Sequence, residues 1–246
     1  MSRRRLEICV DRLDSAIAAR DGGADRIEVC GALASGGTTP GAGLLSACLE
    51  LSPLEVMVMI RPHAGPFVYS PLDLVVMEKE IAAARRAGAH GVVFGALTPD
   101  HDVDRAACRR LLDVAGPLGA TFHRAFDLTR DPQEALEALI ELGFERVLTS
   151  GQASTALEGA RLLECLVKQA AGRIVVMPGA GVNAANVANL LALTNATELH
   201  ASASEPIEPV RAPGDQRWDF VFPGRATTVA RVRALRTAID SVAPPD

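Results

Sequence analysis

Short apolar runs alternate with longer amphipathic stretches along the chain. Runs rich in Val, Ile, Leu and Met are typical of strands, and apolar positions three and four residues apart are typical of helices. Strands are predicted at residues 6–10, 26–30, 55–61, 91–97, 120–126, 146–150, 173–177 and 198–202. Helices are predicted at residues 13–22, 42–51, 72–87, 103–114, 132–142, 155–171, 183–193 and 227–242. Strand and helix therefore alternate regularly.

The predicted strands are apolar almost throughout, which is typical of a parallel sheet covered by helices. Several helix boundaries carry their own signals, because Asp131-Pro132 is an N-cap with a first-turn proline and Gly88 and Gly143 stand where glycine ends a helix. Repeated strand–helix units in a chain of 246 residues favour a closed (β/α)8 barrel, of TIM type, as one domain over residues 1–246. Residues 205–225 predict a long loop after the last strand, with Trp218.

Composition excludes several classes of function. The formal net charge is -5, so no basic field recruits nucleic acid. No window approaches the ~20 apolar residues of a membrane span. The five cysteines are spread out without a CxxC pair, which indicates reduced thiols and not a disulfide framework. We expect a soluble, cytoplasmic protein.

Polar residues gather at the carboxyl ends of the predicted strands, where a barrel carries its working face. Residues two apart on a strand share a face. The candidates for the lumen are therefore Glu7 and Cys9, Glu28 and Cys30, Arg61, His123 with Asp127, and His200 with Ser202. Arg124 has the opposite parity in the stretch ATFHRAFD. The set is either a satisfied polar core, with Arg61 paired to Glu7 or Glu28, or a ligand site.

Cys9 and Cys30 end two adjacent predicted strands. Neighbouring strands lie ~4.8 Å apart, so two thiols at similar height could share a soft monovalent metal such as Cu(I). The alternative is two packed thiols. The remaining cysteines, Cys48, Cys108 and Cys165, lie in predicted helices and are interpreted as small buried hydrophobes.

A glycine-rich stretch after the seventh strand suggests an anion site. Barrels often bind phosphate with the loops after strands 7 and 8. Gly179, Gly181 and Ser202 are the candidates for this role. The alternative is that the glycines only make tight turns.

Several motifs together resemble the CutC copper-homeostasis family. They run in order from residue 6 to about residue 204: LEICVDRLDSA, GGADRIEVC, GGTTP, MIRPHAGPFVYS, GVVFGALT, TFHRAFD, RVLTSG, VVMPGAGV and ELHASAS. The resemblance implies a TIM-type barrel, a cytoplasmic location, a role in copper homeostasis and a homo-oligomer, commonly a dimer. It also implies Cys9 and Cys30 as copper ligands, and it places His123, Arg124 and Asp127 in a family motif.

The chain departs from the family pattern at His63 and in the stretch after Ser204, which is shorter and lacks a basic, asparagine-containing segment. Two functions stay open. One is a copper-homeostasis protein that binds Cu(I) through Cys9 and Cys30. The other is an enzyme, with no reaction assigned, that acts on a small phosphorylated or carboxylated metabolite. The residues for this second role are Glu28 and His123 as acid–base groups, Arg61 and Arg124 as anion clamp, and Glu7, Asp127 and His200 beside them.

Overall fold

Eight parallel strands form the centre of the molecule. The structure is a computed structural model and describes residues 3–207 and 224–243. The strands are β1 (Arg5–Val10), β2 (Arg26–Val29), β3 (Glu55–Met59), β4 (Gly91–Phe94), β5 (Gly119–Phe122), β6 (Arg146–Thr149), β7 (Val175–Pro178) and β8 (Glu198–Ala201). Neighbouring strands pair in the order β7-β6-β5-β4-β3-β2-β1-β8.

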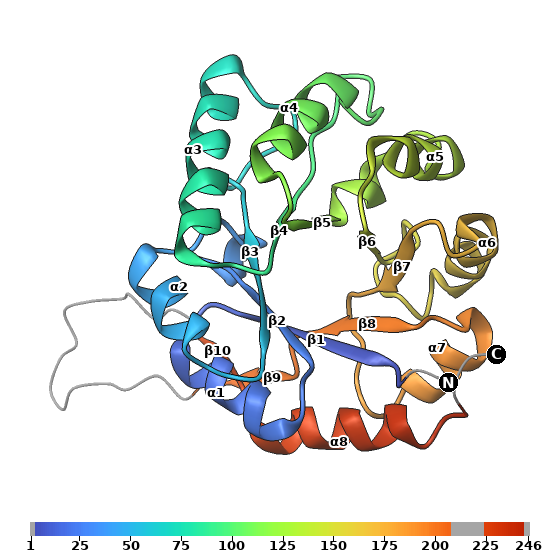
Figure 1. Cartoon of the computed structure of the whole chain (residues 1–246). Coiled ribbons are helices and arrows are strands. Elements are labelled where there is room, and N and C mark those ends of the chain that lie inside the picture. The colour runs from blue at the N-terminus through green and yellow to red at the C-terminus, as the bar shows by residue number, and fades with distance from the viewer. Residues whose placement is uncertain (1–2, 208–223, 244–246) are drawn as a thin grey trace, which may run out of the picture.

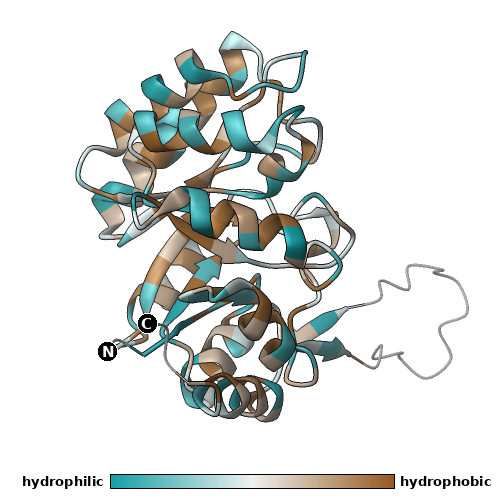
Figure 2. Cartoon of the chain, turned by 90° about the vertical axis from the view of Figure 1, so that its right-hand side faces the viewer, coloured by the Kyte–Doolittle hydropathy of each residue, from teal (hydrophilic) through white to brown (hydrophobic). Residues whose placement is uncertain are grey.

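Helices follow the strands and lie around the outside of the sheet (Figure 1). They are α1 (Leu13–Gly22), α2 (Ala42–Leu49), α3 (Pro71–Ala87), α4 (Arg105–Ala115), α5 (Pro132–Leu142), α6 (Ala160–Ala170), α7 (Val187–Thr194) and α8 (Val229–Asp240). The outer helices carry both hydrophilic and hydrophobic residues, because one face packs on the sheet and the other meets solvent (Figure 2). The predicted (β/α)8 architecture is confirmed.

The barrel is nearly closed. The first and last strands of the sheet order, β7 and β8, lie in contact with each other. Among the described residues, no ladder of backbone hydrogen bonds joins them. The other neighbours pair in register, and Cys9 stands opposite Glu28 while Glu7 stands opposite both Arg26 and His200. This register sets which lumen side chains meet.

The predicted helix boundaries have the expected physical basis. Asp131 accepts hydrogen bonds from the backbone of the first turn of α5, with a proline at its start. Gly88 and Gly143 adopt the left-handed conformation after α3 and α5, at φ of 90° and 91°. Glycine reaches this conformation without the strain that a Cβ would cause.

The structure corrects several sequence predictions. The predicted strands 55–61 and 91–97 end earlier, at Met59 and Phe94, and the helix predicted at 155–171 begins at Ala160. Strand β5 ends at Phe122, and residues from Arg124 to Leu128 form the short 3-10 helix η2 (Arg124–Leu128). The predicted loop 205–225 contains a hairpin of β9 (Ser204–Pro206) and β10 (Arg225–Thr227), and its residues 208–223, with Trp218, lie outside the described residues. Cys48 and Cys108 are buried as expected, but Cys165 is exposed because α6 turns it toward solvent.

No helix in the described part of the chain has both the length and the apolar character that crossing a bilayer requires.

Candidate functional site

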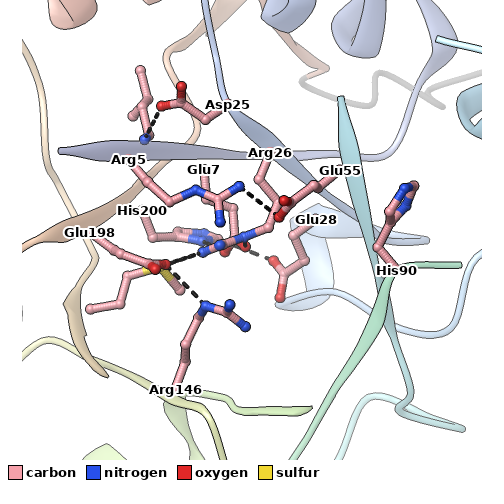
Figure 3. A network of polar contacts seen from close by, with 12 residues as sticks. Arg5, Glu7, Asp25, Arg26, Glu28, Glu55, His90, Arg146, Glu198 and His200 are labelled. Atoms are coloured by element: carbon pink, nitrogen blue, oxygen red, sulfur yellow. Dashed lines mark hydrogen bonds and ion pairs between the residues drawn. The ribbon is translucent and has the colours of Figure 1, made fainter. Parts of the chain in front are cut away.

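Arg26 lies at the centre of a buried ion-pair network inside the barrel (Figure 3). Its side chain is 1% exposed. Nε donates to Glu7 Oε2, and Nη2 donates to Glu198 Oε2 at 2.6 Å. Arg146 Nε donates to the same oxygen of Glu198 at 3.0 Å. The two arginines compensate the two carboxylates, which is the condition for burying such groups.

Arg26 was not among the predicted site residues, although it precedes Glu28 by two positions and therefore shares its face of β2. The expectation that Arg61 pairs with Glu7 or Glu28 is wrong, because Arg26 forms the ion pair with Glu7. The Arg61 guanidinium donates instead to three backbone carbonyl oxygens in the loops after β2 and β3. It fastens these two loops together.

His200, Glu28 and Cys9 form a compact group above this network. One candidate ligand atom from each lies within 4.8 Å of the others. His200 Nδ1 is 2.7 Å from Glu7 Oε1, and its other ring nitrogen, Nε2, is 3.8 Å from Glu28 Oε2. Glu7 therefore fixes the orientation of the imidazole and leaves Nε2 directed at the group.

The carboxyl groups of this site differ in their acidity. Burial alone would raise the pKa of Glu7, but Arg26 and His200 outweigh it and lower the pKa to about 2. Burial raises the pKa of Glu28 to about 7, with Glu7 adding to the rise and His200 opposing it. Burial alone would lower the pKa of His200, but Cys9, Glu7 and Glu28 raise it well above its ordinary value. A fixed carboxylate thus stands beside a carboxyl that can exchange its proton near neutral pH.

The two candidate thiols are not at the same height. Cys9 stands level with Glu28, whereas Cys30 is two residues further along the chain, just past the end of β2. The Cys30 thiol is buried and lies 3.5 Å from Glu28 Oε2. Burial raises the pKa of Cys30 well above its ordinary value, and the Glu28 charge adds to this. Cys9 is half-buried. Cys9 is thus the more accessible sulfur, and Cys30 the deeper one.

Further sulfur atoms lie in the lumen near Cys30. Cys30, Met57, Met59 and Val93 form one buried cluster inside the barrel, separate from the large core between the strands and the helices. Thiols and thioethers are soft ligands. The lumen wall beside the group is therefore rich in sulfur.

His123 belongs to a second cluster. Its ring centre is 4.7 Å from that of Phe67, and the Arg61 guanidinium stands over the same Phe67 ring at 4.9 Å. His123 Nδ1 accepts a hydrogen bond from Ala125 N, and Nε2 has no partner among the described residues. Burial lowers the pKa of His123 to about 3, and the Arg61 charge adds to this. His123 is a buried neutral imidazole.

Asp127 does not pair with His123, contrary to the expectation from strand alternation. The chain leaves the strand conformation at His123, which caps η2, so the parity no longer applies. Asp127 instead accepts hydrogen bonds from Thr149 Oγ1 and from the backbone and hydroxyl of Ser150. Arg124 donates to Asp127 at 2.7 Å and to Ser150 Oγ at 3.1 Å. These residues join the loops after β5 and β6.

The glycines of the predicted anion site have packing contacts. A Cβ at Gly179 would stand 2.5 Å from Leu148 Cδ1 and 3.3 Å from His200 Cβ, so glycine lets β7 approach His200. The Gly181 carbonyl accepts hydrogen bonds from two asparagine side chains that shape the turn before α7. Ser202 lies elsewhere, on a cavity at the carboxyl end of β8.

This cavity has a volume of about 500 Å³. It lies at the carboxyl ends of β1 and β8 and is bordered by the β9–β10 hairpin. Cys9 forms part of its wall, and Arg12, Ser202, Ser204 and Arg225 also line it. The most accessible sulfur of the group is thus reached from an opening of the size that small molecules occupy.

The sequence model of the CutC family matches residues 4–205. A human protein named copper homeostasis protein cutC homolog is 51% identical over 198 residues, which cover 80% of this chain and 72% of that protein. A CutC family protein of Sinorhizobium medicae is 46% identical over 246 residues, covering 99% of each chain.

Solved structures agree with the fold. The crystal structure of a putative copper homeostasis protein CutC from Streptococcus agalactiae aligns with a TM-score of 0.78 and 32% identity, covering 81% of this chain and 98% of that one. A phosphoribosylanthranilate isomerase of Thermotoga maritima aligns at a TM-score of 0.60 with 12% identity, covering 97% of this chain and 100% of that one. The latter likeness concerns the barrel fold alone.

Proposed function

The chain belongs to the CutC family, and on that premise we propose that it serves copper homeostasis by binding Cu(I) at the mouth of its barrel. The ligands are the sulfurs of Cys9 and Cys30 and the Nε2 nitrogen of His200. One observation carries the proposal: ligand atoms of Cys9, His200 and Glu28 converge within 4.8 Å, beside a cavity that Cys9 borders. Cys30 adjoins this group, because its Sγ lies 3.5 Å from Glu28 Oε2.

The chemistry of the donors fits a soft metal. Thiolates and thioethers select Cu(I), and imidazole also suits copper. Cys30 lies beside Glu28 and packs with the thioethers of Met57 and Met59. The hydrogen bond from His200 to Glu7 has the form by which metal-binding histidines are held, with one ring nitrogen on a carboxylate and the other on the metal. Binding releases protons, because a thiol binds as the thiolate and His200, whose pKa is raised, must give up its Nε2 proton to bind a metal.

Replacing the two thiols should abolish Cu(I) binding. We expect one Cu(I) per wild-type chain in an anaerobic titration against a chromogenic Cu(I) chelator. Cys9→Ser should lower the affinity about 100-fold or more, since even residues that only orient a ligand cost 10–100-fold. Glu7→Gln, which alters the partner of His200, should fall within that smaller range.

Cys165→Ser is the matched control, because this thiol is exposed on α6, outside the candidate ligand group. Unchanged affinity in the Cys9→Ser/Cys30→Ser double variant would rule out the proposed ligands. A clear preference of the wild-type site for Zn²⁺ over Cu(I) would also contradict the proposal.

Glu28 favours a second candidate function, acid–base catalysis on a small phosphorylated or carboxylated metabolite. This carboxyl group is buried, and its Oε1 has no hydrogen-bond partner among the described residues. Its pKa of about 7 suits a group that gives and takes protons at neutral pH. The neutral His123 would serve as a hydrogen-bonding partner, and Arg61 and Arg124 would attract the anion.

A thermal-shift screen of phosphorylated and carboxylated metabolites tests this second function. We expect a metabolite that raises the melting temperature of the wild-type protein and is turned over. Glu28→Gln should lower that turnover by about 10²- to 10⁴-fold, the usual contribution of a general acid or base. Cys165→Ser serves again as the control. A screen without any stabilising metabolite argues against an enzyme.

The proposed setting is the cytoplasm, as a homodimer, in line with the family resemblance. All five cysteines are free thiols in the structure, as a reducing compartment requires. Analytical ultracentrifugation of the purified chain would measure its mass, and a monomer at micromolar concentration would contradict the dimer.

A further inference from the structure

The cavity of about 500 Å³ beside Cys9 is large enough to hold a whole small molecule next to the thiol. Its lining is mixed, with hydroxyl groups of Ser202, Ser204 and Thr227 and the guanidinium of Arg225. Cys9 is half-buried in the cavity wall, so a partner must enter the cavity to touch it. A small molecule can do so more readily than a thiol fixed on the surface of a folded protein.

The charge of the cavity favours an anion. Arg225 donates to the Ser204 hydroxyl at 3.1 Å and to the Ser204 carbonyl at 2.8 Å, which holds the guanidinium in place. Among the residues that the structure describes, no carboxylate lies within ion-pair distance of Arg225. Arg12, the other cation, is bound to Asp14, and the one lining carboxylate, Asp11, accepts a backbone hydrogen bond from Leu33. Arg225 is therefore the charge that can meet a ligand.

We propose that Cu(I) reaches Cys9 as the complex of a low-molecular-weight thiol that carries carboxylates, with Arg225 binding the carboxylate. This inference rests on the proposed function, because it names the donor for the same Cu(I) site. Cu(I) is soft and travels on thiolates. In the transfer, the bond between copper and Cys9 Sγ forms and the bond between copper and the donor sulfur breaks. The Cys9 proton leaves with the departing thiol, and copper stays Cu(I) throughout.

The test compares two donors of opposite charge under anaerobic conditions, by stopping the reaction at successive times and measuring the copper bound to the protein after the small thiol is removed. The probes are Cu(I)–glutathione, which is anionic, and Cu(I)–cysteamine, which carries an amine. Arg225→Gln should slow transfer from Cu(I)–glutathione about three- to fivefold, as for one exposed ion pair. Transfer from Cu(I)–cysteamine should not slow, and the equilibrium affinity for Cu(I) should not change.

Two further variants make the result specific. Arg86→Gln removes the same charge from the exposed end of α3 and should change neither rate. Ala34→Trp adds bulk at an exposed position that lines the cavity, and should slow transfer from both donors. If Cu(I) binds normally but Arg225→Gln leaves the glutathione rate unchanged, the anionic donor is wrong and the copper site stands. If neither donor transfers Cu(I) to the wild-type protein, and the chelator titration also shows no binding, both proposals fall.

Discussion

Arg26→Leu should destabilise the protein by about 3–5 kcal/mol, the cost of removing one partner from a buried ion pair. Arg26 is the only partner that contacts both Glu7 and Glu198 in the described network, and the three side chains are nearly inaccessible to water. Without the guanidinium, Glu7 keeps only His200 and Glu198 keeps only Arg146 among these contacts. Urea unfolding followed by circular dichroism would measure the loss.

Arg110→Leu provides the matched control. Arg110 also donates two hydrogen bonds to carboxylate oxygens, but both go to Glu78 and lie on the outer faces of α4 and α3. Its loss should cost at most about 1 kcal/mol. Arg26→Lys should fall between the two, since an ammonium keeps the charge but cannot reproduce the planar fork. If Arg26→Leu is too unstable to purify, the loss of unfolding free energy in Arg26→Lys can still be measured. Equal losses for Arg26→Leu and Arg110→Leu would show that the network is not stabilising.

His123 should make the protein sensitive to acid. Its pKa is about 3 in the folded protein, against an ordinary value of 6.5. Between these two pH values His123 is protonated in the unfolded chain but not in the folded protein. The free energy of unfolding therefore falls as the pH falls through this window. The contribution is at most about 1.4 kcal/mol per pH unit, and it vanishes above pH 6.5.

His123→Asn isolates this effect. Asparagine is a good N-cap and can accept the hydrogen bond that Ala125 N gives to His123 Nδ1, but it does not titrate. The unfolding free energies of wild type and variant should be compared at pH 8, where both side chains are neutral, and at pH 6, 5 and 4. The wild type should lose up to about 1.4 kcal/mol more per pH unit below pH 6. If the unfolding free energies of wild type and His123→Asn fall equally as the pH falls, His123 binds its proton in the folded protein as well, and the prediction is wrong.

The barrel could be predicted from the sequence because its signals are local. Strand and helix periodicities, the Asp131 cap and the glycine helix ends each depend on a few neighbouring residues. The end of β5 could not be predicted in this way. The residues HRAFD continue the alternation of polar and apolar positions that is typical of a strand. In the structure the chain turns into η2 at His123, whose side chain accepts a hydrogen bond from Ala125 N.

Four of the residues that the sequence pattern assigns to the lumen lie together in the structure, but Arg61, His123 and Asp127, assigned to the same site, make other contacts. Glu7, Glu28, His200 and Cys9 do meet in the lumen. The partners of these side chains depend on how far each strand is shifted along its neighbour. In a barrel this shift is linked to the tilt of all the strands, so it cannot be predicted from the sequence of one segment. For this reason Arg26, at the start of β2, faces Glu7. Arg61, two residues beyond the end of β3, instead donates to loop carbonyls and lies over the Phe67 ring.

The unpaired join between β7 and β8 has a consequence for the motions of the barrel. Strand edges without a partner ladder offer little resistance to local opening, so amide protons along this join should exchange with solvent before those of the paired strands. His200 stands on β8, and Gly179 at the end of β7 lies against it. The imidazole of the candidate site therefore stands beside the one join of the described barrel that lacks such a ladder, and we expect local opening at this join to move it.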